Sequence, residues 1–137
     1  MSQAISSNLK TRLQWSLLSL RVGVFIVFLM WTLDKFFYPG HTAKVFEKFY
    51  GISGSSDIIV YVLASLQVLL ILAFVTGVKK RITYGLIFLM HGASTLSAFG
   101  QYLDGFNNLL FFAAWPMWAA CFTLYLLRDE DVKFTIK

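Results

Sequence analysis

Long apolar runs, separated by short polar segments, dominate the chain. They occupy about residues 13–37, 58–78, 82–100 and 108–127. The hydrocarbon core of a bilayer is about 30 Å thick, so a helix that crosses it needs about 20 mostly apolar residues. The runs have about that length and are apolar nearly all round, whereas helices of a soluble bundle keep a polar stripe. We therefore predict an all-α fold, with residues 1–137 forming a single membrane domain that is a four-helix transmembrane bundle.

The connection between the first two runs, residues 38–57, is the only long loop. Pro39 and Gly40 end the first span, and Thr42 is suitably placed to cap a short helix over residues 43–50. Apolar side chains fall on one face of that helix and charged ones on the other. The two sets are Val45, Phe46, Phe49 and Tyr50, and Lys44, Glu47 and Lys48. This pattern is typical of an interfacial helix that lies in the headgroup plane.

Composition supports a membrane protein. Of 137 residues, 58% are hydrophobic and 14% are charged, against roughly 45–50% apolar and 25% charged in a soluble domain. A soluble monomer is excluded, because so small a domain cannot bury that much apolar surface. The lone Cys121 excludes an intrachain disulfide and a Cys-rich zinc or iron–sulfur site formed by this chain alone.

The net charge of +5 follows from basic residues that stand at the ends of the apolar runs. That distribution is a topology signal and not a nucleic-acid patch. Basic residues precede the first run, form the turn between the second and third, and follow the fourth: Lys10 and Arg12, Lys79 to Arg81, and Arg128, Lys133 and Lys137. The positive-inside rule then places both termini and the Lys79–Arg81 turn in the cytoplasm. The first run is too long for a signal peptide and is expected to be retained.

Ionisable groups inside a span are costly and mark candidate functional residues. Arg21 lies about two turns inside the first span, where it either extends to the inner headgroups or forms an ion pair or anion contact within the bundle. Asp34 and Lys35 lie at the outer end of the same helix. They form either an interfacial pair or part of an outward-facing polar pocket. The other members of that pocket would be Gln101, Asp104, Asn107 and Asn108, and Trp31 could wall it.

A second set of polar residues falls near the middle of the spans. Tyr84, His91 and Thr95 share a helical face, and Gln67 has a similar depth. Pro116 in the fourth span leaves the carbonyl of Phe112 without its helical donor. These groups either satisfy one another through interhelical hydrogen bonds or form a midplane site for a quinone headgroup, a proton or a lipid-soluble substrate. The candidate ligand-binding residues are Gln67, His91, Thr95, Tyr84 and Trp31.

Other chemistry finds little support in the sequence. His41 and His91 lie at different depths, so a bis-histidine haem is not expected, and two histidines without acidic neighbours make a poor metal site. The sequence has no Gly-rich phosphate loop, Ser-His-Asp set or H-E-x-x-H motif. We expect no self-contained catalytic site and no resident haem, zinc or iron–sulfur cluster. Small residues such as Ala93, Ser97 and Gly100 favour close helix packing.

The layout of four spans with one long loop after the first resembles the DoxX-like family of small bacterial membrane proteins. The residues that carry the resemblance are Arg21, Gly23, Lys35, Pro39 and Gly51, with the amphipathic segment between the last two. The resemblance implies a four-helix membrane bundle in a bacterial inner membrane. It also implies an association with redox chemistry, because DoxX-like proteins are linked to quinol oxidase subunits and membrane oxidoreductase complexes.

Three functions follow as hypotheses. The first is an accessory or structural subunit of a membrane redox complex, with lipids and a membrane protein partner or a second copy of this chain around it. The second is a binding or transport module for a quinone or other small lipophilic molecule at the midplane site. The third is a quinone-linked enzyme subunit in which Arg21, Asp34 and Lys35 act on charge.

Overall fold

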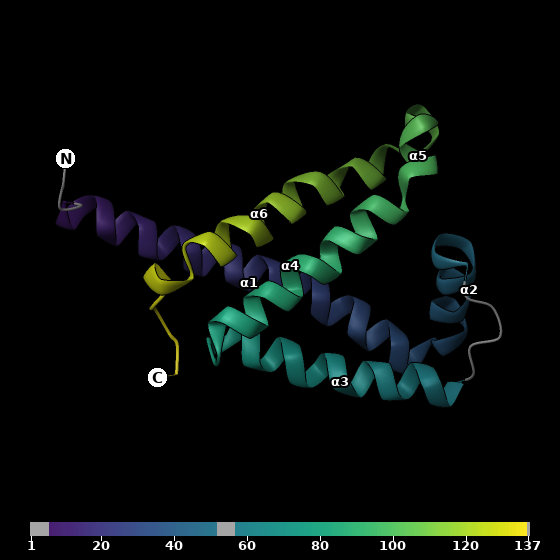
Figure 1. Cartoon of the computed structure of the whole chain (residues 1–137), viewed down its shortest axis with the longest axis horizontal. Helices are drawn as coiled ribbons and strands as arrows, with labels where there is room; N and C mark the ends of the chain where they lie inside the picture. The colour runs from purple at the N-terminus through teal and green to yellow at the C-terminus, as the bar shows by residue number, and fades with distance from the viewer. Residues whose placement is uncertain (1–5, 52–56, 137) are drawn as a thin grey trace.

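The computed structural model describes residues 6–51 and 57–136, and all regular structure within these ranges is helical. Figure 1 shows the order of the elements along the chain. The α-helices are α1 (Ser7–Phe37), α2 (Pro39–Tyr50), α3 (Asp57–Val75), α4 (Lys80–Ser97), α5 (Phe99–Leu103) and α6 (Ala114–Leu126). Three short 3-10 helices complete the set: η1 (Gly105–Asn107), η2 (Leu109–Ala113) and η3 (Arg128–Glu130). The expectation of an all-α chain is confirmed for the described residues.

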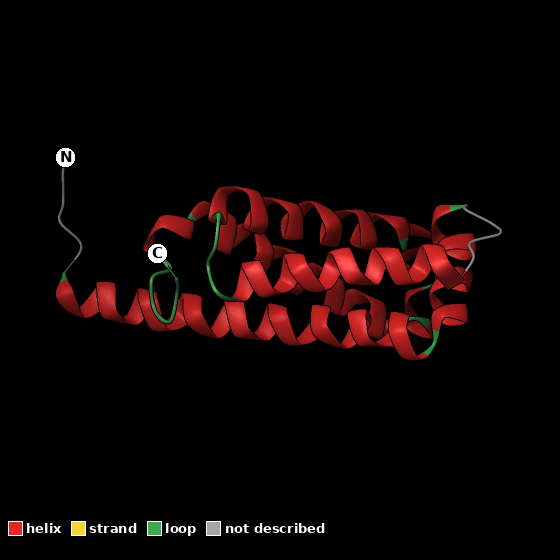
Figure 2. Ribbon diagram, turned by 90° about the horizontal axis from the view of Figure 1, so that it is seen from below, coloured by secondary structure: helices red, strands yellow, loops and turns green. Residues whose placement is uncertain are grey.

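The long helices pack as two antiparallel pairs. α1 lies against α3, and α4 lies against α6, while contacts of α1 with α6 and of α3 with α4 join the pairs. Figure 2 shows their axes running nearly parallel along the molecule, and Figure 1 shows the pairs diverging toward α2 and α5. We call this the α2–α5 end. The α3–α4 turn and η3 lie at the opposite end, the turn end, and the first turns of α1 project beyond them.

Three helical segments are long and apolar enough to cross a membrane. They are Ser7–Phe37, Asp57–Val75 and the continuous segment Leu109–Leu126 formed by η2 and α6. These correspond to the first, second and fourth predicted spans. The third, predicted over residues 82–100, is divided between α4 and α5. α4 is not among the three, because Lys80, Arg81 and His91 lower its mean hydropathy.

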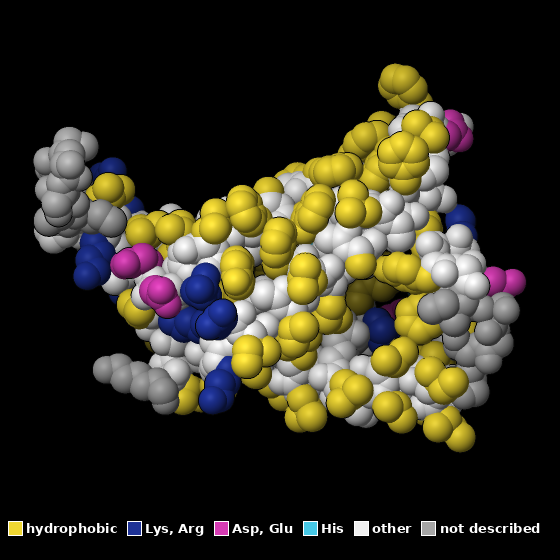
Figure 3. Space-filling view, in the orientation of Figure 1, with side chains coloured by type: hydrophobic (Ala, Val, Ile, Leu, Met, Phe, Trp, Pro, Cys, Tyr) yellow, Lys and Arg dark blue, Asp and Glu magenta, His cyan; other side chains and the backbone are white. Residues whose placement is uncertain are grey.

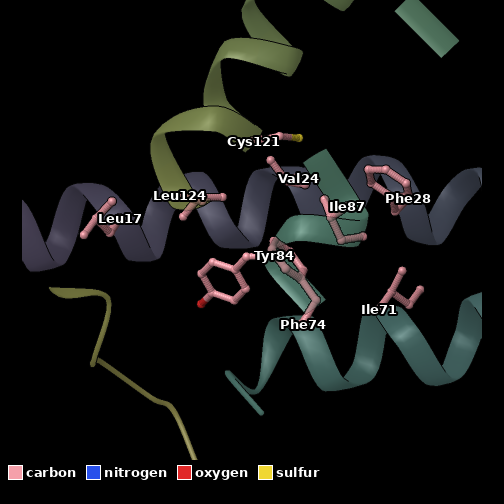
Figure 4. Close-up of a cluster of buried hydrophobic side chains, with 9 residues drawn as sticks. All are labelled: Leu17, Val24, Phe28, Ile71, Phe74, Tyr84, Ile87, Cys121 and Leu124. Atoms are coloured by element: carbon pink, nitrogen blue, oxygen red, sulfur yellow. The ribbon is translucent and has the colours of Figure 1, made fainter. Parts of the chain in front are cut away.

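The core lies between the two pairs and draws on all four long helices. Figure 4 shows nine buried side chains that meet there: Leu17, Val24 and Phe28 of α1, Ile71 and Phe74 of α3, Tyr84 and Ile87 of α4, and Cys121 and Leu124 of α6. On α1 the buried positions recur every three or four residues, which is the period that keeps one face of a helix turned inward. Arg21 belongs to this buried stripe.

The first loop differs from its prediction at one end. α2 begins at Pro39 and not after Thr42, and Thr42 is a buried residue within the helix. Proline is favoured at the first helical position because its missing N–H would have no intrahelical acceptor there. The prediction that Thr42 caps the helix is therefore wrong. The C-terminal boundary at Tyr50 is confirmed, since Gly51 adopts the left-handed conformation with φ of 68°.

The fourth predicted span is helical but not uniform. Residues Leu109–Ala113 form a 3-10 helix, and the α-helix begins at Ala114. Pro116 therefore lies in the first turn of α6, where a proline is tolerated, and not in the middle of a long helix. The change of helix type lets the chain pass this proline without a break in the apolar segment.

Apolar side chains cover much of the outside of the molecule. They are spread over the visible face in Figure 3, while several Lys and Arg side chains gather near the turn end. Leu66, Leu69 and Leu89 are between 59% and 67% exposed. A continuous apolar flank of this extent is expected where lipid takes the place of water as the solvent.

Gly92 of α4 provides a test of the contact between α4 and α6. A Cβ added there would lie 2.8 Å from Nε1 of Trp118. We expect Gly92→Ala to lower the free energy of unfolding by about 1–3 kcal/mol through overpacking. Thermal unfolding in detergent micelles, followed by circular dichroism, measures the effect.

Gly23→Ala is the matched control, because no atom lies within 4 Å of an added Cβ on that residue of α1. It should leave stability unchanged or raise it by up to about 1 kcal/mol through helix propensity. Equal stability of the two variants would show that α4 and α6 do not approach as closely as described.

Candidate functional site

A buried ion pair joins α1 to the segment that follows α6. Nη1 of Arg21 donates to Oδ1 of Asp131, and the two residues are 1% and 0% exposed. Arg21 reaches this position because it lies on the inward stripe of α1. Asp131 comes directly after η3, where the chain turns back toward the helices. Of the two sequence hypotheses for Arg21, the structure shows the internal ion pair.

Further hydrogen bonds surround this pair and fix the C-terminal segment. The Tyr84 hydroxyl donates to Oδ2 of Asp131 at 2.7 Å. Nη2 of Arg21 donates to the carbonyl of Lys133, and Nζ of Lys80 donates to the carbonyl of Asp131. The N–H of Ile136 donates to the carbonyl of Thr76 at 2.7 Å. We call Arg21, Tyr84, Lys80 and Asp131 the Arg21–Asp131 network. It connects α1, α4 and the C-terminal segment at the turn end.

This network has little capacity for chemistry on a substrate. Both carboxylate oxygens of Asp131 already accept hydrogen bonds, and the three side chains at its centre, Arg21, Tyr84 and Asp131, are almost completely buried. Nε of Arg21 is the one atom of the guanidinium with no partner in the described part of the chain. Charges buried in this way are stabilised only by good geometry and additional hydrogen bonds. The arrangement is therefore structural.

The sequence analysis did not single out Asp131. It lies outside every predicted span, in the run Asp129, Glu130 and Asp131, and no periodic pattern distinguishes one of the three. Two features of the sequence pointed toward this ion pair. One is an arginine inside a predicted span, which needs a counter-ion, and the other is the acidic run just past the fourth span. Only the path of the chain after α6 selects Asp131.

At the α2–α5 end, Asp34 pairs with a residue of the next helix. Its Oδ2 lies 2.7 Å from Nδ1 of His41, and the His41 ring stacks on Trp31 at 6.2 Å. Lys35 is half-buried and makes no hydrogen bond or ion pair within residues 6–51 and 57–136. Asp34 therefore connects α1 to α2.

The four residues proposed to complete an outer polar pocket are not joined to Asp34 or Lys35 by any hydrogen bond or ion pair in the described residues. Asp104 instead forms a local cluster: its carboxylate accepts from Asn107 at 3.0 Å, and its backbone carbonyl accepts from Asn108 at 2.9 Å. Such contacts stabilise a tight turn and do not reach α1.

The midplane candidates are only partly brought together. Nε2 of His91 donates to the carbonyl of Ala114 at 3.2 Å, and the His91 ring lies 6.1 Å from Phe28. The buried Thr95 hydroxyl donates to the carbonyl of His91 at 2.8 Å. The carbonyl of Thr95 in turn accepts from the Tyr102 hydroxyl at 2.8 Å. The hydrogen-bond acceptor of His91 is thus the carbonyl of Ala114 at the start of α6. The sequence analysis had considered the carbonyl of Phe112, two residues earlier.

The other three candidates make no hydrogen bond with His91 or Thr95 in the described residues. Tyr84 belongs to the Arg21–Asp131 network, and Trp31 is 51% exposed at the α2–α5 end. Gln67 is a buried residue of α3, and its amide makes no hydrogen bond with any described residue. No group of three His, Cys, Asp or Glu residues that could hold a metal ion occurs within the described ranges.

Comparison with known proteins finds no matching family model, no similar curated protein and no similar solved structure. The class that the structure defines is an all-α protein with three helices apolar enough to cross a membrane. The relation to DoxX-like proteins stays a prediction that rests on the quoted residues.

The Arg21–Asp131 network predicts a large effect of removing its carboxylate. Asp131→Ala leaves the guanidinium of Arg21 buried without a counter-ion, which lowers the free energy of unfolding by about 3–5 kcal/mol. Asp129→Ala is the control, since that residue is exposed and the change should stay within about 0.5 kcal/mol. Denaturant unfolding in micelles compares the two. An Asp131→Ala protein as stable as the Asp129→Ala protein would contradict a buried pair.

Proposed function

We propose that the chain is a small integral membrane protein with four spanning helices and both termini in the cytoplasm. In this proposal α4 is the third span, and its Lys80 and Arg81 lie at the cytoplasmic boundary together with the start of α1 and η3. Three observations support it. The described residues form an even number of long helices, the α3–α4 turn lies at the same end of the molecule as the N-terminal part of α1, and basic residues gather at that end.

We further propose that the protein is an accessory or structural subunit of a membrane complex. One observation carries this proposal: the most deeply buried charged groups serve to hold the fold together. Arg21 and Asp131 bind each other, and Tyr84 completes their hydrogen bonds. The surface that remains available to a partner is the apolar flank. That the complex is a redox complex rests only on the resemblance to DoxX-like proteins.

The outward face of α3 is the part of that flank we assign to the partner. It has a shallow hollow of about 340 Å³. The hollow is lined by Ile58, Tyr61, Val62, Ser65, Leu66 and Leu69. Ser65 is small, and its hydroxyl donates to the carbonyl of Tyr61 at 2.9 Å within the same helix. Small residues between larger apolar ones allow a second helix to approach closely within lipid.

A bulky substitution in the hollow tests this assignment. Ser65→Trp should abolish the partner band or the dimer that native mass spectrometry detects after extraction in native lipid discs. Ile26→Trp is the control, because Ile26 is also exposed, at 53%, but lies on α1. The proposal fails if the wild-type protein is monomeric with bulk lipid alone, or if Ser65→Trp keeps its partner at the same stoichiometry.

The alternative function is binding of a quinone or another small lipophilic molecule between the helix pairs. Gln67 favours it, because its amide has no hydrogen-bond partner within the described residues and its side chain keeps some accessible surface, so a polar headgroup can reach it. His91, whose ring is half-buried beside Phe28, is the second candidate contact. A quinone would supply redox chemistry when bound, while Gln67 would orient its carbonyl.

Gln67→Leu separates the two functions. If a ligand binds there, the variant should lose the co-purifying molecule, seen in the absorbance spectrum and the native mass. His91→Ala should reduce its occupancy as well. If Gln67 has only a packing role, Gln67→Leu should keep or raise the unfolding temperature, because the buried amide disappears. A ligand retained by Gln67→Leu would contradict the binding site.

A further inference from the structure

A basic pocket at the turn end borders the Arg21–Asp131 network and shares Lys80 with it. Its volume is about 430 Å³. It is lined by Lys79, Lys80, Arg81, Ile82, Arg128 and Asp129. The first four belong to the α3–α4 turn and the start of α4, and the last two belong to η3. Figure 3 shows Lys and Arg side chains gathered at this end of the visible face.

The pocket carries excess positive charge that the protein does not neutralise. Lys79 and Arg81 are exposed, and their side chains make no hydrogen bond or ion pair within the described ranges. Asp129, its only carboxylate, makes no ion pair there either. Two basic groups are thus free to contact a ligand from outside.

The remaining two cations are held in place by the fold. Nζ of Lys80 donates to the carbonyl of Asp131. The Arg128 guanidinium donates to the carbonyl of Tyr125 at 2.7 Å and lies 4.5 Å from the centre of its ring. These contacts fix the walls of the pocket before any ligand arrives, which lowers the entropy lost on binding.

The backbone at the start of α4 adds to the positive electrostatic potential of the pocket. Lys79 adopts a left-handed conformation with φ of 51°, and its side chain does not cap the helix. The first N–H groups of a helix have no intrahelical acceptors, and they carry the positive end of the helix dipole. Lys80 and Arg81 therefore present backbone donors as well as side chains beside the pocket.

An apolar surface begins where the basic pocket ends. Ile82 lines the pocket and is 59% exposed. Leu86 and Leu89 follow it at helical spacing on α4, 43% and 66% exposed. On α6, Phe122 is also exposed, at 46%, and its ring lies 5.4 Å from that of Phe88 of α4. A ligand with a charged head and an apolar tail would contact both surfaces.

We propose that this pocket binds the phosphate of an anionic phospholipid, with the acyl chains lying along α4 and α6. Lys79 and Arg81 contact the phosphate, Lys80 and Arg128 hold the rim, and Ile82 marks the boundary between headgroup and chain. The apolar surface favours a lipid over free phosphate, which has nothing to place there. The inference rests on the first part of the proposed function, that the chain is an integral membrane protein, and adds the class of ligand that the turn end binds. It does not depend on a protein partner or a quinone.

Native mass spectrometry of the full chain, titrated in a mild detergent with phosphatidylglycerol or phosphatidylcholine, tests the proposal. Wild-type protein should retain phosphatidylglycerol in preference to phosphatidylcholine. The double variant Lys79→Ala/Arg81→Ala should bind it at least about tenfold more weakly, as expected for two lost contacts to an anionic headgroup. Both side chains are exposed and unpaired, so the variant should fold, and its unfolding temperature is measured alongside.

Lys10→Ala/Arg12→Ala is the matched control. It removes the same charge from exposed positions near the start of α1, and it should change the affinity by less than about twofold. Equal losses in the two double variants would overturn the proposal, because bulk attraction would then account for binding. Inorganic phosphate at millimolar concentration that displaces the lipid completely would overturn it as well, since the ligand would then be the free ion.

Discussion

The ion pair between Arg21 and Asp131 is the constraint on which the rest of the structure depends. Burying a guanidinium in an apolar environment is unfavourable unless a counter-charge and further hydrogen bonds come with it. Arg21 lies on the inward stripe of α1, so its charge is buried as soon as the helices pack. The chain supplies the compensating carboxylate from position 131, beyond its last long helix. The fold is therefore complete only when the C-terminal segment has returned to α1.

The sequence predicted much of the helical architecture because one physical rule governs it. An apolar run of about 20 residues bounded by charge or proline has few alternatives to a helix in lipid. The ends were predicted where local chemistry determines them, as at Gly51. They were missed where two local signals compete: Thr42 is a good cap, but Pro39 begins the helix three residues earlier. Pro116 likewise lies in the first turn of α6 and not inside a longer helix.

The polar sites were harder to predict, because their partners come from distant parts of the chain. Arg21 and Asp131 are separated by 110 residues, and no local pattern connects them. The equal-depth argument for Gln67 and His91 used position along each helix but not rotation about its axis. His91 forms a hydrogen bond with a backbone carbonyl of α6. Every residue has such a carbonyl, so the sequence does not indicate which one will be the acceptor. Position along a helix can thus be read from the sequence, whereas the direction in which a side chain faces depends on how the helix pairs pack.

Lys80 connects the interior of the molecule to its charged surface. Its ammonium holds the carbonyl of Asp131, and the same side chain lines the basic pocket. Arg128 and Asp129, which form the opposite wall, belong to η3 and are positioned by the same C-terminal segment. The pocket can exist only while that segment is docked through Asp131. A ligand that binds the docked form alone would stabilise the docked form by mass action. An anionic headgroup at this pocket would therefore stabilise the ion pair between Arg21 and Asp131 without contacting it. In this way a membrane lipid would stabilise the docked position of the C-terminal segment.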